Sequence, residues 1–121
     1  MVNLPTEHRE CHIVAQRRYT CCECGGHIEA LDVYQHISGT WPQTRRKFFR
    51  TCVLCEDARE WLCTGTDWQG ADGVRGRYEF RRLRRHLLDF AKTGTIAHLR
   101  FAALRRVVEM NRRRTAAKAT A

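Results

Sequence analysis

The 121-residue sequence has no long uninterrupted run of apolar residues, although 43% of its residues are hydrophobic. A membrane-spanning helix needs about 20 consecutive apolar residues, so we expect no membrane span. The N-terminus, MVNLPTEHRECHIVAQRR, also has charged residues where a secretory signal peptide has its apolar centre. We therefore expect a cytoplasmic protein with reduced thiols. A chain of this length leaves no room for two large domains.

Lysine is scarce, because Lys47, Lys92 and Lys118 are the only lysines among 22 basic residues. The formal net charge of +9 is unevenly distributed along the chain. Residues 75–121 hold 14 basic and three acidic residues, a formal charge of +11, whereas residues 1–74 carry −2. The positive charge is therefore concentrated in the C-terminal part.

The glycine-rich segment 65–76 lacks the Gly-x4-Gly-Lys-Ser/Thr pattern of a phosphate-binding loop. We interpret it as a linker or hairpin with a turn at Asp72-Gly73. Trp68 is an unusually large side chain for such a loop. It either packs back over the preceding domain or contacts a partner.

The seven cysteines are the most informative residues, because four of them form two Cys-x2-Cys pairs. Cys21 and Cys24 are followed by Gly25-Gly26, and 27 residues separate this pair from Cys52 and Cys55. Two residues between thiolates allow one tight turn to place both sulfurs about 2.3 Å from a single Zn²⁺. Glycine suits the following position because a sharp turn there often requires a positive φ. We predict one structural Zn²⁺ bound by four thiolates, with disulfide or redox use and an iron–sulfur centre as alternatives.

The remaining cysteines are expected to be small buried hydrophobic residues. Cys22 would need a tighter Cys-x-Cys arrangement to replace Cys21, and Cys11 and Cys63 lie outside the pairs. His27 follows the first pair closely and is the alternative ligand, although the four cysteines already complete a tetrahedral set.

The segments around the cysteines predict an α+β fold. The segment 28–41 has Ile28, Val33, Tyr34, Ile37 and Trp41 among polar residues and turn signals, which predicts a β-hairpin or two short strands. The sequence RRKFFRT predicts a further short strand. From Cys52 onward, apolar residues recur at spacings of three and four, with acidic residues in the first turn. A helix therefore begins at the second cysteine pair.

We call the first cysteine pair and its two glycines, residues 21–26, the knuckle. The order of knuckle, hairpin and helix over about residues 10–64 resembles the treble-clef zinc fold. The run CxxCG…I…Y…G.W…R.C..C over residues 21–55 also resembles small zinc-binding proteins of tailed bacteriophages. The resemblance implies a treble-clef-like nucleus with Cys21, Cys24, Cys52 and Cys55 as ligands. It implies no particular activity, because treble clefs serve many functions.

Residues 77–114 predict a basic α-helical hairpin. Phe80, Leu83, Leu87 and Phe90 form one helical stripe, and a second helix runs from about 97 to 111 with an apolar side of its own. The sequence KTGT between them supplies a helix stop and a helix start. Residues 115–121 are expected to be a disordered tail. The apolar seam would also allow a homodimer.

Arginines interleaved with aromatic residues favour nucleic acid, DNA or RNA, as the partner, because arginine can contact phosphate and stack on a base. The candidate binding residues are Arg45, Arg46, Lys47, Arg81, Arg82, Arg84, Arg85, Arg105, Arg106, Arg112 and Arg113. The alternatives are a merely solvated helix face and binding to an acidic host protein or nucleoprotein complex. The phage resemblance implies, for the last case, an inhibitor of the anti-CRISPR type or a modulator of host transcription.

We expect no enzymatic activity. The treble clef also carries His-Asn-His nucleases, which need a metal-binding histidine on the helix after the hairpin. Here that helix has no histidine, and the only asparagines are Asn3 and Asn111. A zinc with four thiolate ligands also has no open position for water.

Overall fold

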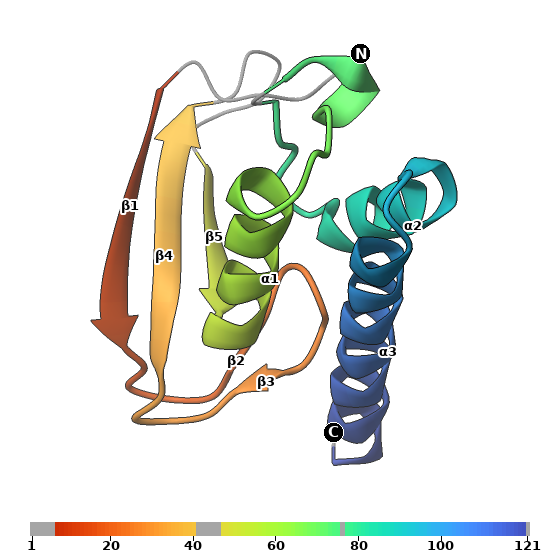
Figure 1. The fold of residues 1–121 in the computed structure, drawn as a ribbon. Coiled ribbons are helices and arrows are strands. Elements are labelled where there is room, and N and C mark those ends of the chain that lie inside the picture. The colour runs from red at the N-terminus through yellow and green to blue at the C-terminus, as the bar shows by residue number, and fades with distance from the viewer. Residues whose placement is uncertain (1–6, 41–46, 76, 121) are drawn as a thin grey trace.

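The computed structural model describes residues 7–40, 47–75 and 77–120 and has an α+β architecture (Figure 1). Its larger sheet is antiparallel with strand order β1-β4-β5, formed by β1 Glu7–Val14, β4 Val33–Thr40 and β5 Lys47–Cys52. A two-residue ribbon pairs β2 Tyr19–Thr20 with β3 His27–Ile28. The α+β prediction is therefore confirmed.

The region predicted as a hairpin or two short strands contains β3 and β4, which do not pair with each other, because β3 pairs with β2 and β4 pairs with β1 and β5. Strand β5 is the further strand predicted from RRKFFRT, and it pairs with β4 from Tyr34 opposite Cys52 to Gly39 opposite Lys47. Trp41 lies outside the described residues.

Strand β1, which the sequence did not predict, pairs with all eight residues of β4. Its side chains from Arg9 to Val14 are exposed. Neither face of β1 is buried over these residues, so its sequence has no alternating apolar pattern that would predict a strand. Its pairing with β4 at the sheet edge holds it in place.

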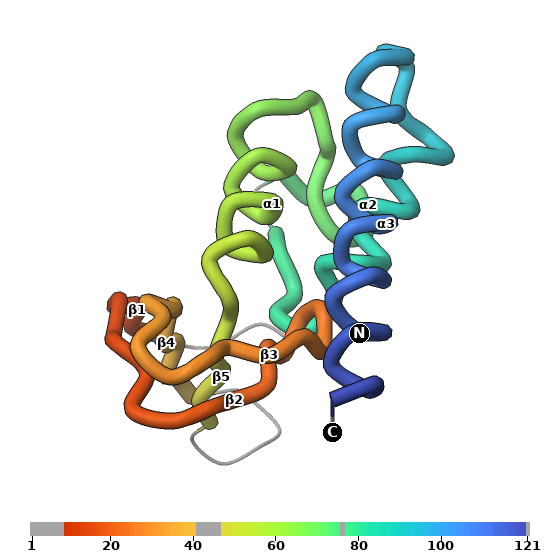
Figure 2. The backbone as a smooth tube through the Cα atoms, turned by 90° about the horizontal axis from the view of Figure 1, so that it is seen from below, coloured from red at the N-terminus to blue at the C-terminus, as the bar shows by residue number. Residues whose placement is uncertain are grey.

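Helix α1 Val53–Thr64 begins directly after Cys52, as predicted. Its buried residues Cys55, Ala58 and Leu62 recur at spacings of three and four, so they share one face. Two perpendicular views show α1 between the larger sheet and the pair of C-terminal helices (Figures 1 and 2).

Helix α2 Leu83–Thr93 begins later than the apolar stripe suggested. Arg81 has a positive φ of 73°, which breaks the helical conformation just before the helix. Phe80 therefore lies outside α2, and its ring stacks on Phe49 of β5 with centroids 6.0 Å apart. Leu83, Leu87 and Phe90 are buried as expected.

Helix α3 Ala97–Ala119 is longer than predicted, because it continues past residue 111 through the segment expected to be a disordered tail. Its last turn is tied to β3, where the His27 Nε2 and Thr120 Oγ1 atoms are 3.1 Å apart. Ala117 is buried in this region.

Within the described ranges, none of the helices combines the length and apolar character that crossing a membrane requires.

The cysteine pairs and the C-terminal helices share one hydrophobic core. It contains Cys21, Cys24 and Cys55 together with apolar residues from every helix, including Leu62 of α1, Leu87 and Phe90 of α2, and Val107 and Met110 of α3. The helical hairpin is therefore packed onto the cysteine-bearing nucleus and has no separate core of its own.

Candidate metal centre

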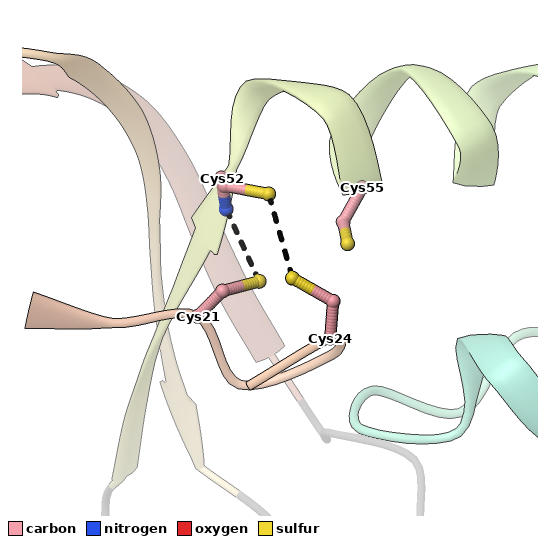
Figure 3. A group of neighbouring side chains, drawn as sticks. All are labelled: Cys21, Cys24, Cys52 and Cys55. Atoms are coloured by element: carbon pink, nitrogen blue, oxygen red, sulfur yellow. Dashed lines mark hydrogen bonds between the residues drawn. The ribbon is translucent and has the colours of Figure 1, made fainter. Parts of the chain in front are cut away.

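The four predicted ligands, Cys21, Cys24, Cys52 and Cys55, come together at one place. Their sulfur atoms all lie within 4.8 Å of one another, and the Cys24 and Cys52 sulfurs are 3.9 Å apart. In a tetrahedral site with Zn–S bonds of about 2.3 Å, neighbouring sulfurs are about 3.8 Å apart. The cluster can therefore hold one metal ion. Figure 3 shows the first pair on the knuckle, Cys52 at the end of β5 and Cys55 in the first turn of α1.

Backbone amides are aimed at the sulfurs. Cys21 Sγ accepts hydrogen bonds from the amides of Glu23 (3.4 Å) and Cys52 (3.3 Å), and Cys24 Sγ accepts one from Gly26 (3.3 Å). Gly25 has the predicted positive φ, 74°. Amide donors stabilise thiolates, so the local backbone is arranged for deprotonated cysteines.

Arg113 of α3 also donates to two ligand sulfurs. Its Nε atom lies 3.4 Å from Cys24 Sγ, and its Nη2 atom lies 3.3 Å from Cys55 Sγ. Burial disfavours the charged guanidinium, but the bonds to both sulfurs outweigh burial and raise the pKa of Arg113. The side chain thus places a positive charge beside the cysteines from a part of the chain remote in sequence.

Four sulfurs this close cannot all ionise without a compensating cation. Hydrogen bonding with Cys21 and Cys52 lowers the pKa of the Cys24 thiol, whereas hydrogen bonding with Cys21 and Cys24 raises that of Cys55. Without a metal, Cys24 is therefore the first of this pair to lose its proton, and Cys55 keeps its proton. A soft divalent cation would replace these protons and stabilise all four thiolates together.

The other cysteines and His27 lie outside the cluster. Cys22 Sγ is 3.5 Å from Thr51 Oγ1, and burial is the main cause that raises its pKa to about 12, so it remains a thiol. Cys11 and Cys63 are exposed, which corrects the expectation that they are buried. His27 contacts Thr120, so the structure gives it a role in holding the end of α3.

Glu23, between Cys22 and Cys24, links the knuckle to α2. Its carboxylate accepts hydrogen bonds from the backbone amides of Arg81 and Leu83, both at 3.0 Å, and from the Tyr78 hydroxyl at 2.8 Å. Burial raises the pKa of Glu23, and these three donors oppose the rise. A carboxylate at the first amides of a helix acts as its N-terminal cap, so the knuckle caps α2.

The predicted binding arginines are in different surroundings. Arg81, Arg82, Arg84, Arg85, Arg105, Arg112 and Lys47 are exposed. Arg106 stacks over the Trp61 ring at 3.9 Å, and Arg113 is bound to the cysteine sulfurs, so both have partners within the molecule. Arg45 and Arg46 lie outside the described residues.

Trp68 is partly buried and packs against the core. Its ring centroid lies 5.0 Å from that of His86 and 6.5 Å from that of Tyr78. Burial lowers the pKa of His86, whose Nε2 accepts a bond from the Glu79 amide at 3.3 Å.

The glycine-rich segment and α2 border an open cleft of about 780 Å³. Its lining includes Arg82 and Arg85 together with Asp67, Asp72 and Asp89.

No protein-family model, curated protein or solved structure matches the chain. The candidate centre therefore rests on the geometry of its own residues.

Proposed function

We propose that this protein is a non-enzymatic binding module stabilised by one structural Zn²⁺. The gathering of four cysteine sulfurs within 4.8 Å carries the proposal. Four thiolates in tetrahedral arrangement are typical of zinc and of iron–sulfur sites, and a ligand set of this kind leaves no open position for a reacting water. The order of knuckle, β4–β5 hairpin and α1 supports a treble-clef-like nucleus.

The helical hairpin would supply the binding surface, and nucleic acid is the partner that its charge favours. Residues 75–121 carry a formal charge of +11, and Arg81, Arg82, Arg84 and Arg85 are exposed at and before the start of α2. Arginine side chains in such a group can contact successive phosphates. The acidic residues that line the cleft beside Arg82 and Arg85 reduce the net charge there. Arg84 donates to Asn111 Oδ1 within the molecule, so Arg81 is the strongest candidate.

Salt-dependent binding to duplex DNA and RNA tests this proposal. If the four arginines contact phosphates, log affinity falls linearly with log salt, with a slope of about 0.9 per phosphate neutralised on B-form DNA. Replacing all four with glutamine, a good helix former, should preserve the fold, weaken binding and flatten the slope by several units. The matched control replaces four arginines that are exposed outside the hairpin, Arg9, Arg17, Arg18 and Arg75.

A glutamine variant with the parent's affinity and slope would remove these arginines from the interface. Failure of the parent to bind either nucleic acid at roughly 0.1 M salt, where close phosphate contacts still act, would contradict the nucleic-acid proposal. That result would not affect the proposal that the protein is a zinc-stabilised binding module. Its partner would then be the alternative predicted from the sequence, an acidic host protein or nucleoprotein.

A further inference from the structure

Helix α3 has a second apolar face, which points away from the core. Phe101, Leu104 and Val108 are 72%, 42% and 46% exposed, respectively. Spacings of three and four place them along one side of the helix. We call these three residues the outer stripe. Single exposed apolar residues are ordinary on protein surfaces, whereas a contiguous row with a largely exposed phenylalanine indicates a binding surface.

The outer stripe continues into a shallow hollow beside the second half of α3. The hollow is lined by Val108, Asn111, Arg112, Thr115 and Ala116 and has a volume of about 460 Å³. Arg84 of α2 donates to Asn111 Oδ1 at 3.0 Å, so the start of α2 lies beside Asn111. The remainder of α3 extends beyond α2, as Figure 1 shows, and one flank of the helix is left without a neighbouring helix.

Basic residues border this surface. Arg105 is exposed four positions after Phe101, and Arg112 is exposed four positions after Val108, so each lies beside the stripe. Helix α3 contains six arginines and one lysine against Glu109 as its single acidic residue, a formal charge of +6. A second copy of this helix would bring like charges together, which disfavours self-association through the stripe.

We propose that the outer stripe of α3 docks an acidic amphipathic helix of another protein. Apolar anchors at helical spacing fit the apolar face of a partner helix laid alongside. Acidic residues beside those anchors would then meet Arg105 and Arg112 and provide orientation and selectivity. A phosphate backbone would contact the arginines but offers no apolar surface for Leu104 and Val108. This surface goes beyond the proposed nucleic-acid contact, which uses the arginines at the start of α2.

The test uses the full zinc-loaded chain and a labelled synthetic helix of roughly 20 residues, because shorter helices are marginal in water. The probe has leucines along one face and glutamates on the others, and a comparison probe has lysine in place of every glutamate. Fluorescence anisotropy should show binding of the acidic probe at roughly 0.15 M salt, where surface charges still interact over about 8 Å. The lysine probe should bind far more weakly.

Phe101→Ala combined with Leu104→Ala should weaken binding of the acidic probe by at least about tenfold, as for anchor residues in interfaces. Val33→Ala, which removes a side chain that is 52% exposed on β4, is the matched control and should leave binding unchanged. Arg105→Glu with Arg112→Glu should reverse the preference between the two probes. Melting curves of all variants should match the parent, because the replaced side chains are exposed.

The proposal is wrong if the acidic probe fails to bind at roughly 100 µM, an affinity weaker than about −5.5 kcal/mol. It is equally wrong if both probes bind alike or if the double alanine variant binds as the parent does. Concentration-dependent dimerisation that the double alanine variant abolishes would assign the stripe to a second copy instead. Loss of DNA or RNA binding in that variant, with no effect on the acidic probe, would assign the stripe to nucleic acid.

Discussion

Arg113 is the residue at which the helical hairpin meets the metal ligands. Four thiolates around one Zn²⁺ would leave a net charge of −2, and a guanidinium bonded to two of the sulfurs would compensate part of that charge. Hydrogen bonds to ligand atoms commonly orient them and tune metal affinity. Because Arg113 belongs to α3, the candidate metal centre includes part of the hairpin as well as the two cysteine pairs.

We predict that Arg113→Gln lowers zinc affinity by about 10- to 100-fold, the usual cost of removing a partner of a ligand. The shorter neutral side chain would lose the charge-assisted bonds to Cys24 and Cys55. Competition against a chromophoric chelator measures the change. Arg112→Gln is the matched control, because Arg112 is the adjacent residue and is exposed. Equal affinities in the two variants would show that Arg113 does not support the site.

The clustering of the four cysteines could be predicted from the sequence, whereas the contact of Arg113 with them could not. Two Cys-x2-Cys pairs with glycine after the first one define a local geometry that holds wherever the rest of the chain lies. Arg113 reaches Cys24 across 89 positions of sequence, and nothing in its own neighbourhood distinguishes it from Arg112 and Arg114. Tertiary packing decides which arginine of such a run turns inward.

Of the helices, α2 depends most visibly on a distant residue. The amide of Leu83 bonds to Glu23, 60 positions earlier, and no side chain next to α2 caps its start. The predicted stripe included Phe80, and the predicted hairpin began at about residue 77, because periodicity alone carries no information about such a cap. The positive φ of Arg81 turns the backbone so that two amides face the same carboxylate.

We predict that Glu23→Ala destabilises the protein by about 1–3 kcal/mol, because the Arg81 and Leu83 amides and the Tyr78 hydroxyl lose their acceptor. Urea unfolding followed by circular dichroism measures this loss. Glu29→Ala is the control, since its carboxylate is exposed and pairs with Arg18 at the surface, where ion pairs contribute little. If both variants unfold at the same urea concentration, the knuckle does not hold α2 through Glu23.

Two other elements show why local patterns were insufficient. Strand β1 is recognisable only from its eight-residue pairing with β4, because its exposed side chains carry no alternation. The end of α3 follows an arginine run and contains alanines and threonine, a composition that indicated a tail. Contacts of Thr120 with His27 and of Arg113 with the sulfurs stabilise this segment as helix.

The molecule as a whole has one core, which the cysteine cluster and the hairpin share. Cys24 and Cys55 share this core with Phe90 of α2 and Met110 of α3. Glu23 and Arg113 connect the cysteine cluster to α2 and α3, respectively. Metal binding should therefore stabilise both the nucleus and the surface that the hairpin presents, since binding energy at a structural zinc site contributes to folding.

Amide hydrogen exchange of the full chain, with zinc and after its removal by a chelator, tests this claim most directly. With zinc bound, amides of β5, α1 and the second half of α3 should be protected. Removal should abolish protection in all three segments together, because a structural zinc site supplies on the order of 10 kcal/mol of folding free energy. The account is contradicted if α3 keeps its protection without zinc, or if the purified chain binds no zinc and exchanges identically in both conditions.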